Sequence, residues 1–148
     1  MTAWRRQVRH LAHSLLDLAL PPVCAGCRHV GQLFCDNCLA QVSWIEEPIC
    51  QRCGRPQVHL TANCPSCHQL PSYFQQIRAA TRHVEPVRTV LHKMKYQGLF
   101  ALSQPLGEIM VRAWPQWQLQ FDLILPIPLH NKRLRERGYN QSELLVNV

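Results

Sequence analysis

The 148-residue sequence has no apolar stretch long enough to cross a membrane, and its first 20 residues do not fit an export signal. His13 and Asp17 interrupt the apolar residues there, and no small-residue cleavage site follows. A signal peptide needs a continuous apolar region, and a membrane helix needs about 20 apolar residues. We therefore expect a cytoplasmic protein without a transmembrane segment.

Residues 1–20 instead predict an amphipathic helix, because their apolar residues recur at alternating steps of four and three. The apolar stripe is Trp4, Val8, Leu11, Leu15 and Leu18, and Arg5, Arg6 and Arg9 lie off it. The pattern ends at Pro21-Pro22. Such a helix could lie on a membrane surface, but short helices draw most of their stability from tertiary contacts. We expect it to pack on the rest of the protein.

Cysteine is absent outside residues 24–67, and all eight cysteines in that range fall into four Cys-x-x-Cys pairs. The pairs are Cys24 and Cys27, Cys35 and Cys38, Cys50 and Cys53, and Cys64 and Cys67. A two-residue gap lets both sulfurs of a pair face one tetrahedral ion, and four thiolates complete a structural zinc site. Eight ligands therefore predict two structural zinc ions.

The gaps between the pairs favour sequential pairing. Seven residues separate the first two pairs and ten separate the last two, so each gap can hold a short hairpin. The first site would then use the four cysteines from Cys24 to Cys38, and the second the four from Cys50 to Cys67. Interleaved pairing remains an alternative, since spacing alone does not exclude it.

Other uses of the cysteines explain fewer of them. Disulfides would require an oxidising compartment, and a redox pair would leave three pairs without a role. The segment from Cys64 to His68 fits the c-type haem attachment pattern, but that use would leave Cys50 and Cys53 without partners. Zinc accounts for all eight.

Acidic residues are scarce: nine Asp and Glu stand against sixteen Lys and Arg, which gives a formal net charge of +7. A zinc ion with four thiolates carries a net charge of −2, so two filled sites lower the total to about +3. This moderate excess favours a polyanionic partner but says nothing of sequence specificity.

Residues 71–148 change to an α/β pattern. One helix is predicted from Pro86 to the residue before Gly98, and a second over 99–114, closed by Pro115. An edge strand or hairpin arm is predicted within 73–83.

Phe121–Leu125 is a continuous apolar run, which is typical of a strand buried on both faces of a parallel sheet. A basic loop follows it, and Asn140 is predicted to cap a last helix together with Glu143. A strand, a basic loop and a helix start can hold a phosphate group. The charges would come from Lys132, Arg133, Arg135 and Arg137. A solvated basic loop is the alternative.

The sequence resembles the ComF/GntX family, whose members are linked to competence and to the use of external DNA. The matching features are the cysteine pattern from Cys24 to Cys67, the segment Leu91–Gly98, and DLILPIPLHNKRLRERGYNQSELL from Asp122 to Leu145. The resemblance implies a double zinc ribbon over residues 21–70. It also implies the N-terminal part of an α/β type I phosphoribosyltransferase-like domain over 71–148.

By this resemblance, five residues would meet the pyrophosphate of phosphoribosyl pyrophosphate in a full-length form. They are Arg133, Arg137, Gly138, Asn140 and Gln141. Phosphoribosyltransferase-like proteins bind the ribose phosphate with two adjacent acidic residues and a threonine- and glycine-rich turn. The one adjacent acidic pair here is Glu46-Glu47, which lies between zinc ligands. We therefore expect a C-terminally truncated member, inactive alone, with no catalytic residues to assign.

Two functions remain open. The first is a ComF-like zinc-binding protein acting in competence, DNA uptake or the use of external DNA. The second is a non-enzymatic zinc-ribbon module that binds single-stranded DNA or a partner protein, such as the DNA-uptake machinery. Trp44, Tyr96 and Tyr139 are candidate base-stacking residues, although each also suits packing. The expected cationic contacts are Lys93, Lys95, Lys132, Arg133, Arg135 and Arg137.

Overall fold

The computed structural model describes residues 21–69, 73 and 75–148. The helix predicted over residues 1–20 lies outside these residues. The elements are α2 (Asp36–Ala40), a 3-10 helix η1 (Pro65–Gln69), α3 (Val87–Tyr96), a 3-10 helix η2 (Phe100–Leu102), α4 (Ser103–Trp117), α5 (Asn131–Arg137) and α6 (Gln141–Val146). No helix among the described residues is both long and apolar enough to span a bilayer.

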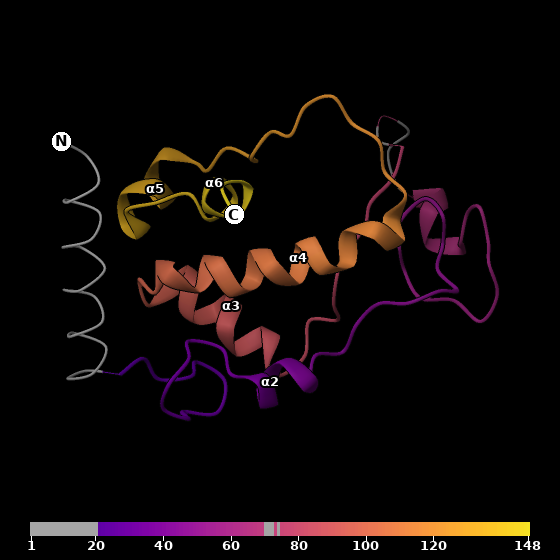
Figure 1. Ribbon diagram of the computed structural model, residues 1–148. Helices are drawn as coiled ribbons and strands as arrows, with labels where there is room; N and C mark the ends of the chain where they lie inside the picture. Colours follow the sequence, from indigo (N-terminus) through magenta and orange to yellow (C-terminus); the bar gives the residue numbers. More distant parts are fainter. Residues whose placement is uncertain (1–20, 70–72, 74) are drawn as a thin grey trace, which may run out of the picture.

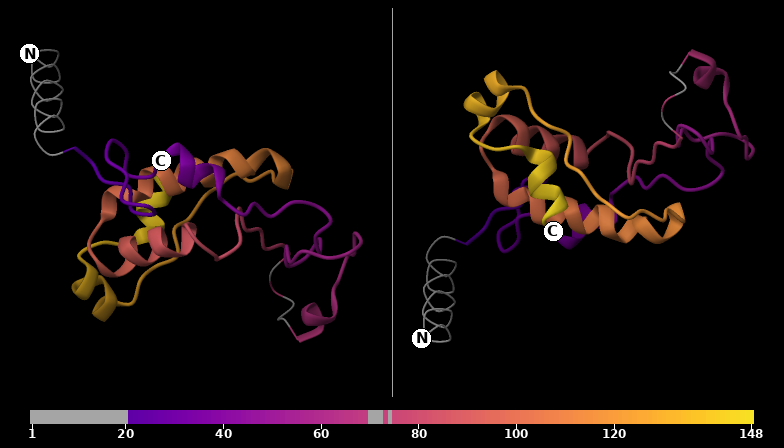
Figure 2. Two further views of the ribbon diagram at one scale, coloured as in Figure 1. Left: turned by 90° about the horizontal axis from the view of Figure 1, so that it is seen from below. Right: turned by 90° about the horizontal axis from the view of Figure 1, so that it is seen from above.

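The helices form the centre of the molecule, with α3 and α4 between α2 on one side and α5 and α6 on the other (Figure 1). The segment around the last four cysteines projects away from these helices, as both views of Figure 2 show. In the described part of the chain the extended segments make only isolated bridges, among them Val23 with Val30, Ile49 with Pro56, and Trp44 with Thr81.

The main apolar core joins the segment of the first four cysteines to α3 and α4. Its buried members are Ala25, Val42, Val87, Val90, Met94, Leu102, Leu106 and Ile109. Lys93 on α3 adds a polar link, since its ammonium group donates a 2.8 Å hydrogen bond to the Ala25 carbonyl. The segment of the first four cysteines and the helices therefore share one core.

Helix α3 confirms the helix predicted after Glu85, with Pro86 as its N-cap and Gly98 just beyond its end. Helix α4 confirms the second predicted helix only in part, because it begins at Ser103, after the 3-10 helix η2, and not at residue 99. Pro115 does not close it either: the helix runs on to Trp117 and ends at Gln118, whose φ is 48°. A proline near the end of a helix removes only the hydrogen bond to the residue four positions earlier. That residue is the exposed Val111, whose carbonyl can bond to water instead.

The predicted strand Phe121–Leu125 does not form. Residues 118–130 run without helix or strand, and Leu123 and Leu125 are 70% and 73% exposed. A buried parallel strand needs neighbouring strands for its backbone and helices over both faces, and the described residues supply no such sheet. Among the described residues of the predicted edge strand, Thr81 alone makes a bridge.

The predicted basic loop is also wrong in part, because most of it folds as α5. The His130 ring accepts the N–H of Lys132, and Arg133 pairs with Glu136 at 2.9 Å, so this helix has its own cap and side-chain pair. Gly138, at φ 81°, ends it. Asn140 caps α6 as predicted, its side chain accepting the Ser142 N–H at 3.0 Å.

Met94→Ala should lower the free energy of unfolding by about 2–5 kcal/mol, because Met94 is fully buried and its loss leaves a cavity between α3 and the core. Met110→Ala on α4 is the control and should cost less than about 1 kcal/mol, since Met110 is 40% exposed. Denaturant titration of the zinc-loaded protein measures both. Equal losses would contradict this core.

Candidate metal centres

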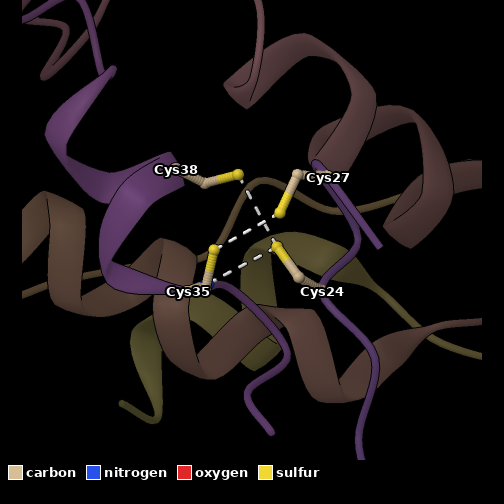
Figure 3. A group of neighbouring side chains, drawn as sticks. All are labelled: Cys24, Cys27, Cys35 and Cys38. Atoms are coloured by element: carbon tan, nitrogen blue, oxygen red, sulfur yellow. Dashed lines mark hydrogen bonds between the residues drawn. The ribbon is translucent and has the colours of Figure 1, made fainter. Parts of the chain in front are cut away.

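The sulfurs of Cys24, Cys27, Cys35 and Cys38 converge on one point (Figure 3). The first pair comes from a loop, Cys35 precedes α2, and Cys38 lies within α2. The Cys24 and Cys38 sulfurs lie 3.6 Å apart, and those of Cys27 and Cys35 lie 3.4 Å apart. We call these four residues the first cysteine cluster.

The other four cysteines form an equivalent arrangement, the second cysteine cluster. Its sulfur–sulfur distances are 3.6 Å for Cys50 and Cys67 and 3.7 Å for Cys53 and Cys64. In each cluster all four sulfurs lie within 4.8 Å of one another. The structure thus groups the cysteines sequentially, the arrangement that the hairpin-length gaps favoured over interleaving.

These distances fit zinc and exclude disulfides. Four sulfurs placed about 2.3 Å from a tetrahedral zinc ion lie about 3.8 Å from one another, whereas a disulfide joins sulfurs at about 2.05 Å. All eight cysteines are free thiols. Haem attachment at Cys64 and Cys67 would break up the second cysteine cluster.

Both clusters are built by the same local backbone. The N–H of the third cysteine donates to the sulfur of the first: Cys35 to Cys24, and Cys64 to Cys50, each at 3.4 Å. These donors stabilise a thiolate at the first position of each cluster.

The pKa values of the clustered thiols also indicate a bound cation. Burial raises the pKa of the Cys24 and Cys50 thiols, but backbone N–H donors outweigh it and lower each pKa to about 6. Burial and the neighbouring cysteines raise the pKa of Cys67 to about 12 and also raise that of Cys38. Four sulfurs cannot all ionise so close together without a positive ion, which a zinc dication provides.

The residue after the second cysteine of each cluster has a left-handed backbone conformation, with a positive φ angle. Arg28 has a φ of 67° and Gly54 a φ of 68°, and each donates its N–H to the carbonyl of the cluster's first cysteine at 2.9 Å. A side chain at Gly54 would also come within 2.6 Å of the Ile77 carbonyl oxygen. At this position the second cluster therefore needs glycine, Gly54, whereas the first cluster accepts a larger residue, Arg28.

The two clusters differ in their surroundings. The first cysteine cluster borders the main core through Ala25 and Phe34. The second is buried among its own cysteines, and the loop between its pairs exposes Val58 and Leu60, at 83% and 59%. A backbone bond from Ile77 to Arg52, of 2.8 Å, links it to the following segment. Metal in the first cluster therefore supports the helices, whereas metal in the second supports mainly its own loops.

Two of the five residues matched to a pyrophosphate loop, Arg133 and Arg137, line one cavity of about 210 Å³. This cavity lies between the end of α3 and α5 and also involves Lys95, Tyr96, Glu136 and Tyr139. Sequence reasoning missed Glu136, although its spacing of three from Arg133 on a helix was a usable signal.

The other three matched residues shape the chain beside this cavity. Gly138 ends α5, and Asn140 both caps α6 and donates to the Ile127 carbonyl at 3.0 Å. Gln141 accepts a 2.8 Å hydrogen bond from Arg137.

The three aromatic candidates occupy different environments. Tyr96 is 61% exposed, with the Arg137 guanidinium 5.1 Å from its ring. Trp44 is half-buried beneath Arg112, at 5.0 Å. Tyr139 packs against the core and donates its hydroxyl to the Met94 carbonyl, and burial raises its pKa despite the nearby Arg137. Only Tyr96 has the exposure that a stacking platform needs.

Cys38→Ser and Cys67→Ser should each lower the zinc content from two ions to one, as measured by metal analysis of the reduced protein. Cys38→Ser should also unfold α3 and α4, because the first cysteine cluster borders their core. Cys67→Ser should leave amide hydrogen exchange in these helices slow. Equal loss of protection in both variants would contradict the different roles of the two clusters.

Gly54→Ala should weaken the second zinc site by about 1–2 kcal/mol through left-handed strain, with a further loss from the close Ile77 carbonyl. Arg28→Gly, at the equivalent position, should change the first site by less than about 1 kcal/mol, since relief of strain offsets the greater freedom of glycine in the unfolded chain. Chelator competition measures both. A larger effect at Arg28 would contradict the comparison.

A double zinc ribbon domain model matches residues 15–70. Together with the two cysteine clusters, this match shows that the protein binds two structural zinc ions. No solved structure matches the chain.

Several bacterial proteins are similar to most of the chain. DNA utilization protein YhgH of Escherichia coli K12 is 27% identical over 140 residues, covering 86% of this chain and 60% of that protein. Competence protein F of Haemophilus influenzae is 25% identical, covering 82% and 55%. Competence protein ComFC of Bacillus subtilis is 28% identical, covering 76% and 49%. The chain therefore spans 60% or less of the length of these relatives, to which it is similar over most of its own length, and residues 15–70 match a double zinc ribbon domain.

Proposed function

We propose that this chain is a zinc-binding protein of competence, acting in the uptake or use of external DNA, and that it contacts single-stranded DNA directly. The names of the relatives, competence protein and DNA utilization protein, support the first part. The observation that carries the second is the surface around the 210 Å³ cavity, where two basic segments of the chain meet.

This surface, the basic face, joins the C-terminal end of α3 to α5. Lys95, Arg133 and Arg137 line its cavity together with Tyr96, and Lys132 and Arg135 lie on the same helix α5. The remaining expected contact, Lys93, is on α3. Lys93 is held by the Ala25 carbonyl and Arg133 by Glu136. In the described part of the chain Lys95, Lys132 and Arg135 make no ion pair, so they are available to phosphate groups.

Aromatic side chains on the basic face suit unpaired bases. The Tyr96 ring is exposed, lies 4.8 Å from the ring of His92 and has Arg137 beside it. Phe100 is 60% exposed and meets Tyr139 edge-on at 6.2 Å. Stacking of a base on such a ring contributes about 1–3 kcal/mol and tolerates any base. The combination of cations and exposed rings favours binding of single strands without sequence preference.

Electrostatics favour this face over the zinc ribbon. Each thiolate-bound zinc ion leaves a net charge of −2 within the ribbon and cancels much of the charge of its arginines. The electrostatic attraction for a polyanion is therefore stronger at α5 than at either cysteine cluster.

The family resemblance supports a finer assignment of the second half. Residues 71–148 would be the N-terminal part of a type I phosphoribosyltransferase-like domain. Arg133, Arg137, Gly138, Asn140 and Gln141 would then hold a pyrophosphate in a longer form. The shared cavity of Arg133 and Arg137 supports this, whereas the Glu136 ion pair competes with it. Eight free cysteines fit the reducing cytoplasm as the compartment.

A second candidate is a non-enzymatic ribbon that binds a partner protein. The exposed apolar side chains of Val58 and Leu60 in the second ribbon loop favour it. Binding that depends on these two residues and not on α5 would distinguish it from DNA contact.

Replacing Arg133, Arg135 and Arg137 together by Ala should weaken binding of single-stranded DNA and flatten its salt dependence. Loss of three phosphate contacts lowers the slope of log affinity against log salt by about 2. Fluorescence anisotropy with a labelled oligonucleotide measures both quantities.

The matched control replaces Arg55, Arg82 and Arg88 by Ala, which removes the same charge at exposed positions away from α5. It should keep the slope of the parent, and both variants should keep two zinc ions. If the α5 variant binds as tightly as the parent at low salt, DNA does not contact the basic face, and the ribbon around Trp44 and Arg52 becomes the candidate.

A further inference from the structure

Each cysteine cluster has a cationic side chain hydrogen-bonded to its backbone. In the first cluster the Lys93 ammonium group donates a 2.8 Å hydrogen bond to the carbonyl of Ala25, the residue after Cys24. In the second cluster the Arg52 guanidinium donates to the carbonyl of Cys67 at 3.3 Å. Both hydrogen bonds are partly buried, so solvent screens the two charges less than it would on an open surface. The same kind of contact thus occurs at both candidate zinc sites.

A nearby cation is useful at such a site because four thiolates carry more charge than one zinc ion neutralises. The zinc ion and its four thiolates have a net charge of −2, and a buried excess charge is costly unless an opposite charge lies nearby. A cation on the backbone of the cluster lowers this cost without taking a ligand position. We infer that Lys93 stabilises the zinc-loaded first cluster through its charge and so raises the zinc affinity of that site, and that Arg52 does the same for the second.

The two cations come from different parts of the chain, and Gly26 explains the difference. Arg52 lies within a Cys-x-x-Cys turn of its own cluster, directly before Cys53. The equivalent position in the first cluster is Gly26. A Cβ there would lie 2.7 Å from the Cys38 sulfur and 3.3 Å from the Pro86 Cβ, so a side chain at this position would clash with the cluster. The first turn therefore cannot carry its own cation at this position, and α3 supplies one instead.

This origin of the charge couples the first zinc site to the docking of α3. Pro86, the N-cap of α3, lies against Gly26, and Lys93 follows about two turns later on the same helix. Val90, between them in sequence, is fully buried in the core that α3 shares with the first ribbon. Helix α3 places the ammonium group on the Ala25 carbonyl only when it is docked there. Zinc binding at the first site and docking of α3 therefore reinforce each other.

The zinc affinities of Lys93 variants test the inference, measured by competition with a chromophoric chelator. The parent is the full chain with Cys67→Ser, which should hold a single zinc ion in the first cluster. Lys93→Gln removes the charge but keeps a hydrogen-bond donor, and it should weaken zinc binding about tenfold or more. Lys93→Arg should restore most of the affinity, since it keeps the charge. Lys132→Gln removes the same charge from an exposed position on α5 and should leave the affinity unchanged.

A second measurement separates the effect of charge from that of packing. At saturating zinc, amide hydrogen exchange in α3 and α4 should be as slow in Lys93→Gln as in the parent, because the apolar core is unchanged. Fast exchange under these conditions would overturn the inference, since Lys93 would then act on packing. Undiminished zinc affinity in Lys93→Gln, equal weakening by Lys132→Gln, or failure of Lys93→Arg to restore the affinity would each overturn it as well.

The second site gives an independent test, because its cysteines are not part of the core that contains the helices. In the full chain with Cys38→Ser, which should keep zinc in the second cluster, Arg52→Gln should weaken zinc binding about tenfold or more. Arg55→Gln, in the loop of the same cluster and exposed, is the matched control and should have no effect. Equal zinc affinity in these two variants would overturn the role of Arg52.

Discussion

Coordination by buried thiolates is the interaction on which the rest of this structure depends. Residues 21–69 contain one short α-helix and a 3-10 helix, and among the described residues no strand ladder joins their loops. Their largely buried side chains are mostly the cysteines themselves. Zinc binding contributes on the order of 10–16 kcal/mol per site, which replaces the apolar burial that such a segment lacks. Because the four sulfurs of each cluster repel one another when ionised, the metal is also what allows them to lie close together.

The first cysteine cluster extends this order into the helical part. Ala25 lies between two of its ligands in sequence and is also a member of the main core, and its carbonyl binds Lys93 of α3. Arg112 over Trp44 and the bridge from Trp44 to Thr81 add a second connection, from the chain between the ribbons to α4 and the segment before α3. The helices thus pack on a surface that the chain around the first cysteine cluster provides.

Features that depend on neighbouring residues could be predicted from the sequence, and features that depend on distant ones could not. The Cys-x-x-Cys spacing, the start of α3 and the Asn140 cap are local, and the structure contains all of them. The strand at Phe121–Leu125 depended on partner strands, and without them its apolar residues are exposed. The predicted basic loop folds mostly as helix α5, because its residues have high helix propensity and Arg133 pairs with Glu136 one turn away. The cavity shared by the end of α3 and α5 depends on tertiary packing, so the sequence did not predict it.

Helix α4 presents apolar side chains on two of its sides. One side of it buries Leu106, Ile109 and Ala113 against the core or its neighbours. Another side presents Met110, Val111 and Trp114, which the extended segment and α6 cover in part. The absence of a side chain at Gly107 lets Val148 approach α4 at that end, where an added Cβ would come within 2.6 Å of it. A helix that is apolar on two sides is stable in water only when both are covered. The core covers one side of α4, whereas the extended segment and α6 cover the other only in part, so Val111 stays 63% exposed.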